Sequence, residues 1–223
     1  MGRIPALSVA LVLLLGAGCA QDPSVDPAVP PSVPPATASA EPGPSSPSPV
    51  SPSASPTPTG PSVPGTAGAL DVSATVADAG FASFASPSGK IWCALYEEDA
   101  LCHFPFDYAG KIPNSKKVCP ELSELDVTGV AVSADGADYF CSGDPGSLPQ
   151  VEDSDSAAST RWWPATGWPS VKLDGQKLAT LPYGKSLVAG DYVCASARDG
   201  VTCANTATGK GFRMARAGVA FID

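Results

Sequence analysis

Short runs in which apolar and polar residues alternate, broken by Gly, Pro and Asp, recur along the chain after residue 69. A period of two is typical of β-strands that bury one face. No segment keeps an apolar stripe of 3.6-residue period over three helical turns. The pattern therefore predicts an all-β fold, a compact sandwich or barrel built from short hairpins. The extended segments that we predict are 70–76, 90–96, 101–104, 127–133, 139–141 and 211–222, and Pro182 and Gly184 predict a bend within 178–188. We expect the segment 211–222 to supply Phe212, Met214, Val219 and Phe221 to the core.

Two stretches, 89–104 (GKIWCALYEEDALCHF) and 190–212 (GDYVCASARDGVTCANTATGKGF), resemble each other. In both, apolar residues precede a cysteine, a polar tip follows, and a second cysteine stands nine positions after the first. Each stretch predicts two strands that are joined by a turn and cross-linked near the base. The alignment matches Cys93 with Cys194 and Cys102 with Cys203.

The N-terminus has the features of a bacterial export signal. Residues 1–18 hold one Arg and an apolar run over 6–15, which is shorter than the ~20 residues that a transmembrane helix needs. The ending LGAGC resembles the lipobox of lipoproteins, with Gly16 where a larger aliphatic residue is commoner. We therefore expect removal of residues 1–18 and anchoring of Cys19 in the membrane through acyl chains such as palmitate, because one chain alone anchors weakly. The alternative is an ordinary signal peptide that happens to contain a cysteine.

Residues 19–68 follow as a tract of Pro, Ser, Ala, Thr and Val with hardly any charge. Such a tract cannot bury enough apolar surface to offset the entropy of ordering, so it predicts a disordered linker. Near the polyproline II conformation it would reach up to ~150 Å. That length would carry a single β-rich extracytoplasmic domain, residues 69–223, from the membrane into the cell wall.

Cysteine parity supports this organisation, because setting Cys19 aside from seven cysteines leaves six that can pair. Hairpin geometry favours Cys93–Cys102 and Cys194–Cys203, and Cys119–Cys141 is left over. Cross-pairing between the two hairpins, such as Cys93 with Cys203, is the alternative. The sequence has no C-x-x-C and His103 is its one histidine, so we predict no metal site.

The formal net charge of −9 disfavours nucleic acid and any electrostatic hold on anionic lipid, since both need basic patches. The charge is uneven: residues 69–160 carry a net −11 and residues 161–223 a net +4. Two interpretations stay open. The halves attract each other within one domain, or they form a bipolar surface that orients a partner.

The sequence offers no catalytic set and no cofactor motif. A Ser-His-Asp hydrolase would have to use His103, which follows a presumed disulfide cysteine and lacks a nearby G-x-S-x-G, so we expect a structural histidine. The acids that might pair in a glycosidase stand in presumed exposed loops, the tip at 97–99 and the loop at 144–159, where nothing raises a carboxyl pKa. These acids are Glu97, Glu98, Asp99, Glu152, Asp153 and Asp155.

Three tryptophans, Trp162, Trp163 and Trp168, are the remaining candidates for a binding site. Exposed aromatic rings stack on sugars, which a domain facing the cell wall would meet. Tryptophans next to Pro and Arg also commonly cover the side of a β-sandwich, and we favour this packing role.

Four segments together resemble a domain of unknown function found in actinobacterial secreted proteins and lipoproteins. The segments are 84–93 (FASPSGKIWC), 181–184 (LPYG), 194–205 (CASARDGVTCAN) and 209–212 (GKGF). Lys90 stands where that pattern has Asn, Lys210 where it has His, and 213–216 departs from it in part. The resemblance implies an exported, disulfide-bearing domain with no assigned reaction.

The sequence thus predicts a lipid-anchored protein on the outer face of the cell membrane that displays a non-catalytic binding domain. Its expected partners are the membrane, through Cys19, and a cell-wall glycan or an envelope protein. The alternatives from other classes are a carboxylate-dependent hydrolase of wall glycans and a protein inhibitor of a secreted hydrolase.

Overall fold

The computed structural model describes residues 60–144, 146–152 and 156–223, all within one compact unit, Ala54–Asp223. The predicted signal peptide, Cys19 and most of the predicted linker lie outside the described residues. The described part is mostly β, with 13 strands in three sheets, as the alternating pattern predicts. Among its helices, none is both long and apolar enough to span a membrane.

The first large sheet is a five-stranded meander in which each strand pairs antiparallel with the next along the chain. Its strands are β2 (Phe81–Ala85), β3 (Trp92–Tyr96), β4 (Asp99–His103), β5 (Val127–Ser133) and β6 (Ala137–Cys141). The predicted turn at Asp135 and Gly136 connects the last two.

The second large sheet has six strands in the order β1-β9-β10-β11-β12-β13. Five of them form another antiparallel meander: β9 (Ser186–Ala189), β10 (Tyr192–Ala197), β11 (Gly200–Asn205), β12 (Gly211–Ala215) and β13 (Gly218–Ile222). The short strand β1 (Leu70–Asp71) lies parallel to β9 at the edge. The N-terminal part of the domain therefore contributes one strand to the sheet that the C-terminal part builds.

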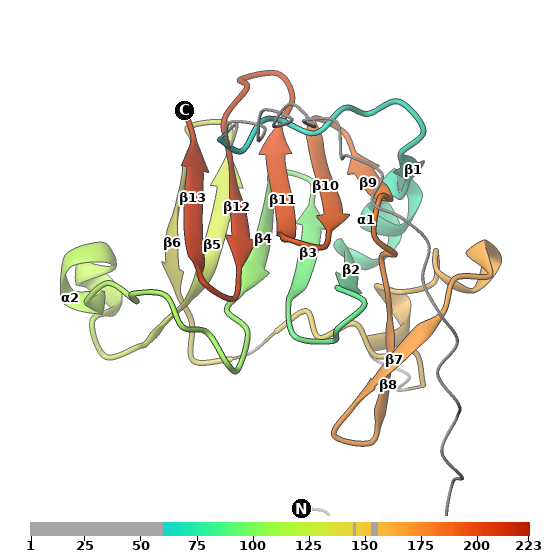
Figure 1. The fold of residues 1–223 in the computed structure, drawn as a ribbon, viewed down its shortest axis with the longest axis horizontal. Coiled ribbons are helices and arrows are strands. Elements are labelled where there is room, and N and C mark those ends of the chain that lie inside the picture. The colour runs from blue at the N-terminus through green and yellow to red at the C-terminus, as the bar shows by residue number, and fades with distance from the viewer. Residues whose placement is uncertain (1–59, 145, 153–155) are drawn as a thin grey trace, which may run out of the picture. The chain divides into compact units, whose positions relative to one another are not determined.

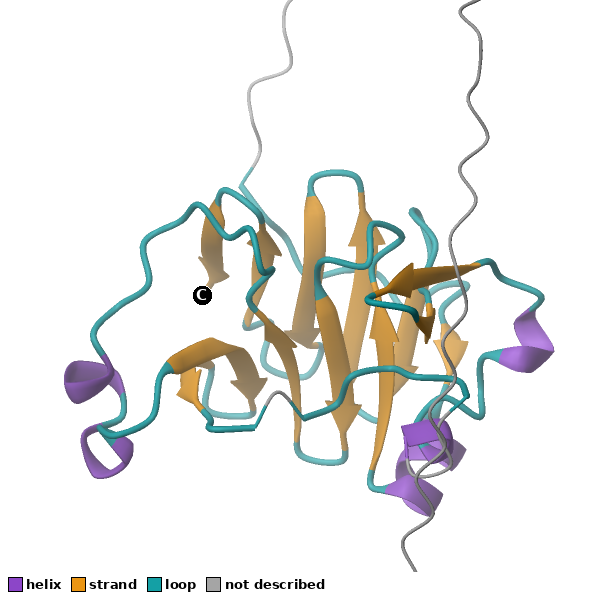
Figure 2. Ribbon diagram, turned by 90° about the horizontal axis from the view of Figure 1, so that it is seen from below, coloured by secondary structure: helices purple, strands orange, loops and turns teal. Residues whose placement is uncertain are grey.

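The two large sheets pack face to face, with β10–β13 in front of β3–β6 in Figure 1. Alternate residues of each strand point inward, and both sheets contribute to a single core. Phe84 and Leu95 from one sheet and Phe212 and Met214 from the other are fully buried there. In the view from below, strands occupy the centre and helices the periphery (Figure 2). Because the sheets are separate, the fold is a sandwich.

The two similar stretches of sequence become two hairpins, β3–β4 and β10–β11, that face each other across this core. Each carries a disulfide between directly opposite residues, Cys93–Cys102 and Cys194–Cys203. The Sγ atoms of Cys102 and Cys203 are 3.6 Å apart, so the disulfides touch. Cys119–Cys141 is the third disulfide. These are the pairs that hairpin geometry favours, and the cross-paired alternative is wrong.

The remaining elements lie at the margins of the sandwich. A separate two-stranded hairpin, β7 (Ser170–Leu173) and β8 (Gln176–Ala179), projects away from both large sheets (Figure 1). The helical elements are α1 (Ser73–Ala79), α2 (Ser115–Val118) and three 3₁₀ turns, η1 (Pro120–Leu122), η2 (Ser156–Ala158) and η3 (Pro164–Thr166).

The extended segment predicted over 70–76 is wrong from Ser73 onward, where α1 begins. The Asp71 carboxylate accepts the backbone N–H of Ser73 at 2.8 Å in a turn that leads into the helix, whose N-cap position is Val72. Gly80, with φ of 84°, ends it by donating its N–H to the carbonyl of Val76. Val72 and Val76 are both buried because a spacing of four places them on one helical face, so the same apolar residues satisfy two periods.

Two other predictions need correction. The last extended stretch, 211–222, is not one strand but the hairpin β12–β13, and Phe221 is 37% exposed rather than in the core. The loop 144–159 is not exposed throughout, because Ser159 is buried and its Oγ lies 2.7 Å from that of Ser83 on β2. Asp153 and Asp155 of this loop lie outside the described residues.

Candidate functional site

Three turns lie along one end of the sandwich and frame a hollow. They connect β2 to β3, β10 to β11 and β12 to β13, and Figure 1 shows them along the lower edge. The hollow has a volume of about 350 Å³. Because its lining includes the charged residues Lys90, Arg198, Asp199 and Arg216, we call it the charged hollow, although most of the lining surface is apolar. Its lining residues are Ser86, Ser88, Lys90, Ile91, Pro105, Tyr183, Ala197, Arg198, Asp199, Gly200, Ala215, Arg216 and Ala217.

The β2–β3 turn is held by its own serines. Gly89, at φ of 73°, donates its backbone N–H to the carbonyl of Ser86 at 2.8 Å, which closes the turn. The buried Ser86 Oγ accepts the backbone N–H of Ile91 at 3.3 Å and lies 3.0 Å from the Ser88 Oγ. The turn therefore presents Lys90 to the hollow from a fixed backbone.

Asp107 ties together two cations of the rim. Its Oδ2 accepts from Lys90 Nζ at 2.5 Å and lies 3.0 Å from Arg216 Nε. The hydrogen bond from Lys90, with the positive charges of Lys90 and Arg216, holds the pKa of Asp107 below its ordinary value despite some desolvation. Arg216 is 68% exposed, so the pair with Asp107 positions this side chain without burying it.

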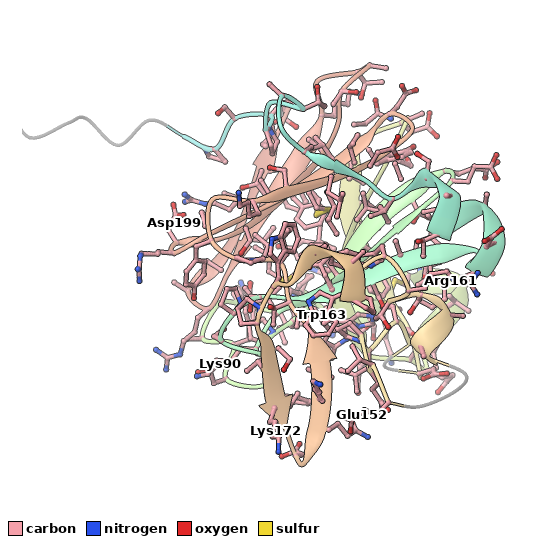
Figure 3. The ribbon with its side chains drawn as sticks, turned by 90° about the vertical axis from the view of Figure 1, so that its right-hand side faces the viewer. Lys90, Glu152, Arg161, Trp163, Lys172 and Asp199 are labelled. Atoms are coloured by element: carbon pink, nitrogen blue, oxygen red, sulfur yellow. A yellow bond between two sulfur atoms is a disulfide. The ribbon has the colours of Figure 1, made fainter. Side chains whose placement is uncertain are left out.

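The β10–β11 turn adds a second group of charges. Arg213 Nη1 donates to Asp199 Oδ2 at 2.6 Å. The Arg198 guanidinium lies over the Tyr183 ring, 5.3 Å from its centroid, which is a cation–π contact. Tyr183 belongs to the bend at 182–184, and that bend is fixed to β10 because Gly184 donates its N–H to the Ser196 carbonyl at 2.7 Å. Lys90 and Asp199 lie on the same flank in Figure 3.

The carboxyl groups in and beside the charged hollow can be compared with those of a glycosidase. A glycosidase needs one carboxyl group with a raised pKa beside a second that stays ionised. Asp199 in the lining of the charged hollow and Asp107 beside it are both paired with cations. For Asp107 this lowers the pKa, the opposite of the shift that a general acid needs.

One carboxyl group elsewhere contradicts the prediction that nothing raises the pKa of the 97–99 tip. Asp99 is half-buried at the start of β4, and burial, together with the charge of Glu98, raises its pKa. Its Oδ1 is buried and has no hydrogen-bond partner among the described residues. Of the other acids considered, Glu152 lies 3.9 Å from Lys177 Nζ, and Glu98 accepts the Tyr192 hydroxyl through its backbone carbonyl.

The tryptophans pack against the core, as the favoured interpretation has it. Trp162 is 8% exposed and meets Trp168 edge to face, with ring centroids 6.0 Å apart. Trp163, half-buried, lies near the centre of the view in Figure 3 and has Lys177 Nζ 5.9 Å from its ring centroid. None of the three is fully exposed, and the indole N–H groups of Trp162 and Trp163 are buried. Trp163 and Trp168 thus keep only part of their surface exposed, and Trp162 almost none.

His103 is also a structural residue. Its side chain is 5% exposed. The imidazole ring stacks on the Trp92 ring with centroids 5.5 Å apart and meets the Phe140 ring edge to face with centroids 5.3 Å apart. Burial lowers its pKa to about 4, although the charge of Asp144 acts in the opposite direction. A neutral imidazole between aromatic rings, with no serine nucleophile against it among the described contacts, does not make a hydrolase triad.

The sulfur atoms nearest to a metal-binding geometry belong to disulfides. The Sγ atoms of Cys93, Cys102 and Cys203 lie within 4.8 Å of one another, and all three are buried. Disulfide bonding removes the thiolates that a metal would need.

The sequence predicts the individual turns of the charged hollow but not that they meet to form one site. The segments 84–93, 181–184 and 194–205, which carry the family resemblance, all contribute to it, whereas Asp107 and Arg216 belong to none of them. No alternation or spacing signals that these turns meet, because the sandwich brings together residues about a hundred positions apart. The one signal for the site in the sequence is that the segments 84–93, 181–184 and 194–205 each include a turn.

Comparisons with known proteins found no match to the chain among protein-family models, curated proteins or solved structures. The resemblance to an actinobacterial domain of unknown function therefore stays a prediction.

Proposed function

We propose that the protein is a lipid-anchored lipoprotein of the bacterial cell envelope and that its β-sandwich is a non-catalytic binding module. Cys19 holds it on the outer face of the membrane, and the Pro-rich linker carries the sandwich into the wall. The signal for anchoring is the LGAGC ending with the even number of cysteines that remains after it.

The observation that carries the binding function is the charged hollow. It gathers Lys90, Arg198 and Arg216 at a concave surface, and the carboxylates of Asp199 in the lining and Asp107 beside it are paired with cations. A wall component or an envelope protein that presents negative charge is therefore the partner that this surface fits. The tryptophans support packing, so binding of neutral sugar by stacking on them is the less favoured mode.

Two measurements test this function. Labelled palmitate, supplied to a bacterium that makes lipoproteins, should enter the wild-type protein and not Cys19→Ala. The soluble chain from residue 20 onward should be retained by isolated cell envelopes, and the double variant Lys90→Gln with Arg198→Gln should be retained less. The core, the three disulfides and the hollow all lie after residue 69, so this shortened chain keeps them. Equal retention of variant and wild type would refute the assignment to the hollow.

A second candidate function, inhibition of a secreted hydrolase, is favoured by the β7–β8 hairpin. This element projects from the sandwich, and its tip at Asp174 and Gly175, both with positive φ, is a tight two-residue turn. Exposed Lys172 stands directly opposite Lys177 near that tip (Figure 3). An inhibitor of this kind would insert such a hairpin into an acidic cleft.

The inhibitor function is tested by assaying a panel of secreted glycosidases and proteases with wild type and with Lys172→Glu. Inhibition that the substitution abolishes supports it, and no inhibition of any member at micromolar concentration counts against it. The third class, a carboxylate hydrolase, has the raised pKa of Asp99 in its favour, but Asp99 does not line the charged hollow.

A further inference from the structure

The charged hollow is a cationic concavity in an acidic protein. Four basic side chains lie at or beside it against two carboxylates, a local net charge of +2, whereas the whole chain carries −9. The basic residues are Lys90, Arg198, Arg213 and Arg216, and the acids are Asp107 and Asp199. Solubility is already served by the negative surface, so this reversal of sign points to an anionic ligand.

The cations keep donors available for that ligand. Arg198 has no carboxylate within ion-pair distance among the described residues, and its Cζ lies over the Tyr183 ring, 5.3 Å from the ring centroid. A cation–π contact uses the positive charge and leaves N–H donors of the guanidinium for an oxyanion. Arg216 contacts Asp107 through Nε, which leaves its terminal Nη groups as donors. The carboxylates thus position the cations while the net charge stays positive.

The rest of the lining suits a phosphate on a small hydroxylated carbon skeleton. The Ser88 hydroxyl lies beside Lys90, whereas that of buried Ser86 is held within the turn. Ile91, Pro105 and three alanines supply apolar surface against which a carbon skeleton can lie. The three cations of the lining, Lys90, Arg198 and Arg216, come from three separate turns. A phosphate presents more acceptor oxygens than a carboxylate does, so three separate donors suit a phosphate better. The volume of about 350 Å³ is in the range of ~300–1,000 Å³ for small-ligand sites.

We infer that the charged hollow binds a phosphate ester or diester carried on a glycerol or sugar unit. This inference names the ligand class of the binding function proposed above and rests on it. Two sources at the envelope share this chemistry: an anionic wall polymer with phosphodiester links, and the headgroup of a phospholipid. Lys90 and Arg198 would contact the phosphate oxygens, and Arg216, held by Asp107, would be the third donor.

The test measures binding of the chain from residue 20 onward to three probes by titration calorimetry. The probes are poly(glycerol phosphate), glycerol alone, and vesicles of phosphatidylglycerol in phosphatidylcholine. Arg198→Gln and Lys90→Gln are compared with matched controls outside the hollow, Arg161→Gln and Lys117→Gln. Arg161 pairs with Asp78 at 3.0 Å and lies on the opposite flank from Lys90 in Figure 3, and Lys117 is on α2.

We expect the wild type and both controls to bind poly(glycerol phosphate) and not glycerol. Each hollow variant should lose about tenfold or more in affinity, the loss that a charge-assisted hydrogen bond commonly gives. Arg198→Lys should recover part of the affinity, because it restores the charge but not the planar fork. Binding should also weaken as salt is raised. A thermal melt of each variant checks that it is folded.

Each possible binding result either supports or overturns the inferred ligand class. Binding to the polymer alone identifies a wall polymer as the source, and binding to the vesicles as well adds the lipid headgroup; both results support the inference. It is overturned if the folded wild type binds no phosphate probe, or if the hollow variants bind as tightly as the controls. If phosphate probes fail while Lys90→Gln with Arg198→Gln still lowers retention on isolated envelopes, the binding module stands and only its ligand class is wrong.

Discussion

Burial decides the protonation state of the one histidine in the chain. His103 packs between Trp92 and Phe140, and burial lowers its pKa to about 4 against the charge of Asp144. As the pH falls, the unfolded chain takes up this proton first, near 6.5, and the folded chain only near 4. The stability that the neutral imidazole contributes is therefore complete above about pH 6.5 and is lost progressively as the pH falls toward 4.

We expect the free energy of unfolding to drop by roughly 3 kcal/mol between pH 7 and pH 4 on account of His103. Denaturant titrations at several pH values measure this drop in the free energy of unfolding. The substitution His103→Gln should abolish the part of the drop that His103 causes. Asp99 acts with the opposite sign, because its raised pKa gives stability that is complete below about pH 4 and lost as the pH rises. The wild type and His103→Gln both contain Asp99, so the difference between their free energies of unfolding at each pH isolates the effect of His103. Parallel curves of this free energy against pH would contradict the prediction.

A second residue-scale prediction concerns Gly129, where a side chain has no room. A Cβ at this position of β5 would come 2.2 Å from the carbonyl oxygen of Cys102 and 2.6 Å from the Phe140 ring. The nearer atom is backbone in the next strand, which cannot move without breaking the ladder. Gly129→Ala should cost about 3 kcal/mol of stability in chemical denaturation. Gly218→Ala is the control, because nothing lies within 4 Å of its Cβ position, and a similar loss there would refute the steric argument.

Among the elements, the facing hairpins β3–β4 and β10–β11 hold the centre of the sandwich. The Cys93–Cys102 disulfide closes a short loop, with a sequence separation of 9, and Cys119–Cys141 a longer one, with 22. Loop entropy alone predicts that the longer loop stabilises slightly more, about 3 kcal/mol for either. Packing of the side chains predicts that the shorter loop stabilises more, because Cys93 and Cys102 are fully buried and Cys102 contacts Cys203.

We expect packing to prevail. Replacing Cys93 and Cys102 together by Ala should cost about 5 kcal/mol, because a core cavity adds to the loss of the cross-link. Replacing Cys119 and Cys141 should cost about 3 kcal/mol, since Cys119 is only half-buried. Midpoints in guanidinium chloride give the comparison. A larger loss for the second pair would show that chain entropy governs both.

Local spacing made these hairpins predictable from sequence. Cysteines nine positions apart around a polar tip fix both a turn and a register, so both short disulfides followed from the residues. Helix α1 did not follow, because Val72 and Val76 fit a period of two as well as one of 3.6. The division of 211–222 into β12 and β13 was also missed, since Arg216 and Ala217 at its turn are not turn formers by type.

The charged hollow marks the limit of such reasoning. Its turns were readable one by one, but the meeting of Lys90 with Asp107 and Arg216 depends on how two sheets pack. Counting charges along the sequence gives only the sign of the net charge of residues 69–160 and of residues 161–223. A site built from turns of different hairpins becomes visible when the sheet order and the facing of the sheets are known.

At the scale of the whole molecule, the uneven charge follows the two sheets. Residues 69–160 build the five-stranded sheet and residues 161–223 most of the six-stranded one. Three of the five ion pairs between described residues join a cation of the second half to an acid of the first, those of Arg161, Lys177 and Arg216. This favours mutual attraction of the halves. Each exposed pair is worth only ~0–1 kcal/mol, so burial of apolar surface remains the main stabilising force.

The predicted boundary of the domain near residue 69 can be tested by shortening the chain from its N-terminus. The core begins at Val72, so a chain that starts at residue 60 should melt at the same temperature as one that starts at residue 20. A start at residue 81 should lose about 4 kcal/mol or more. It removes β1, which pairs with β9, and the buried side chains of Val72 and Val76, each worth about 1.5–3 kcal/mol. Thermal melts of the three chains test this boundary. A much lower melting temperature for the chain that starts at residue 60 would place stabilising contacts in the linker. An unchanged melting temperature for the chain that starts at residue 81 would exclude α1 and β1 from the folded core.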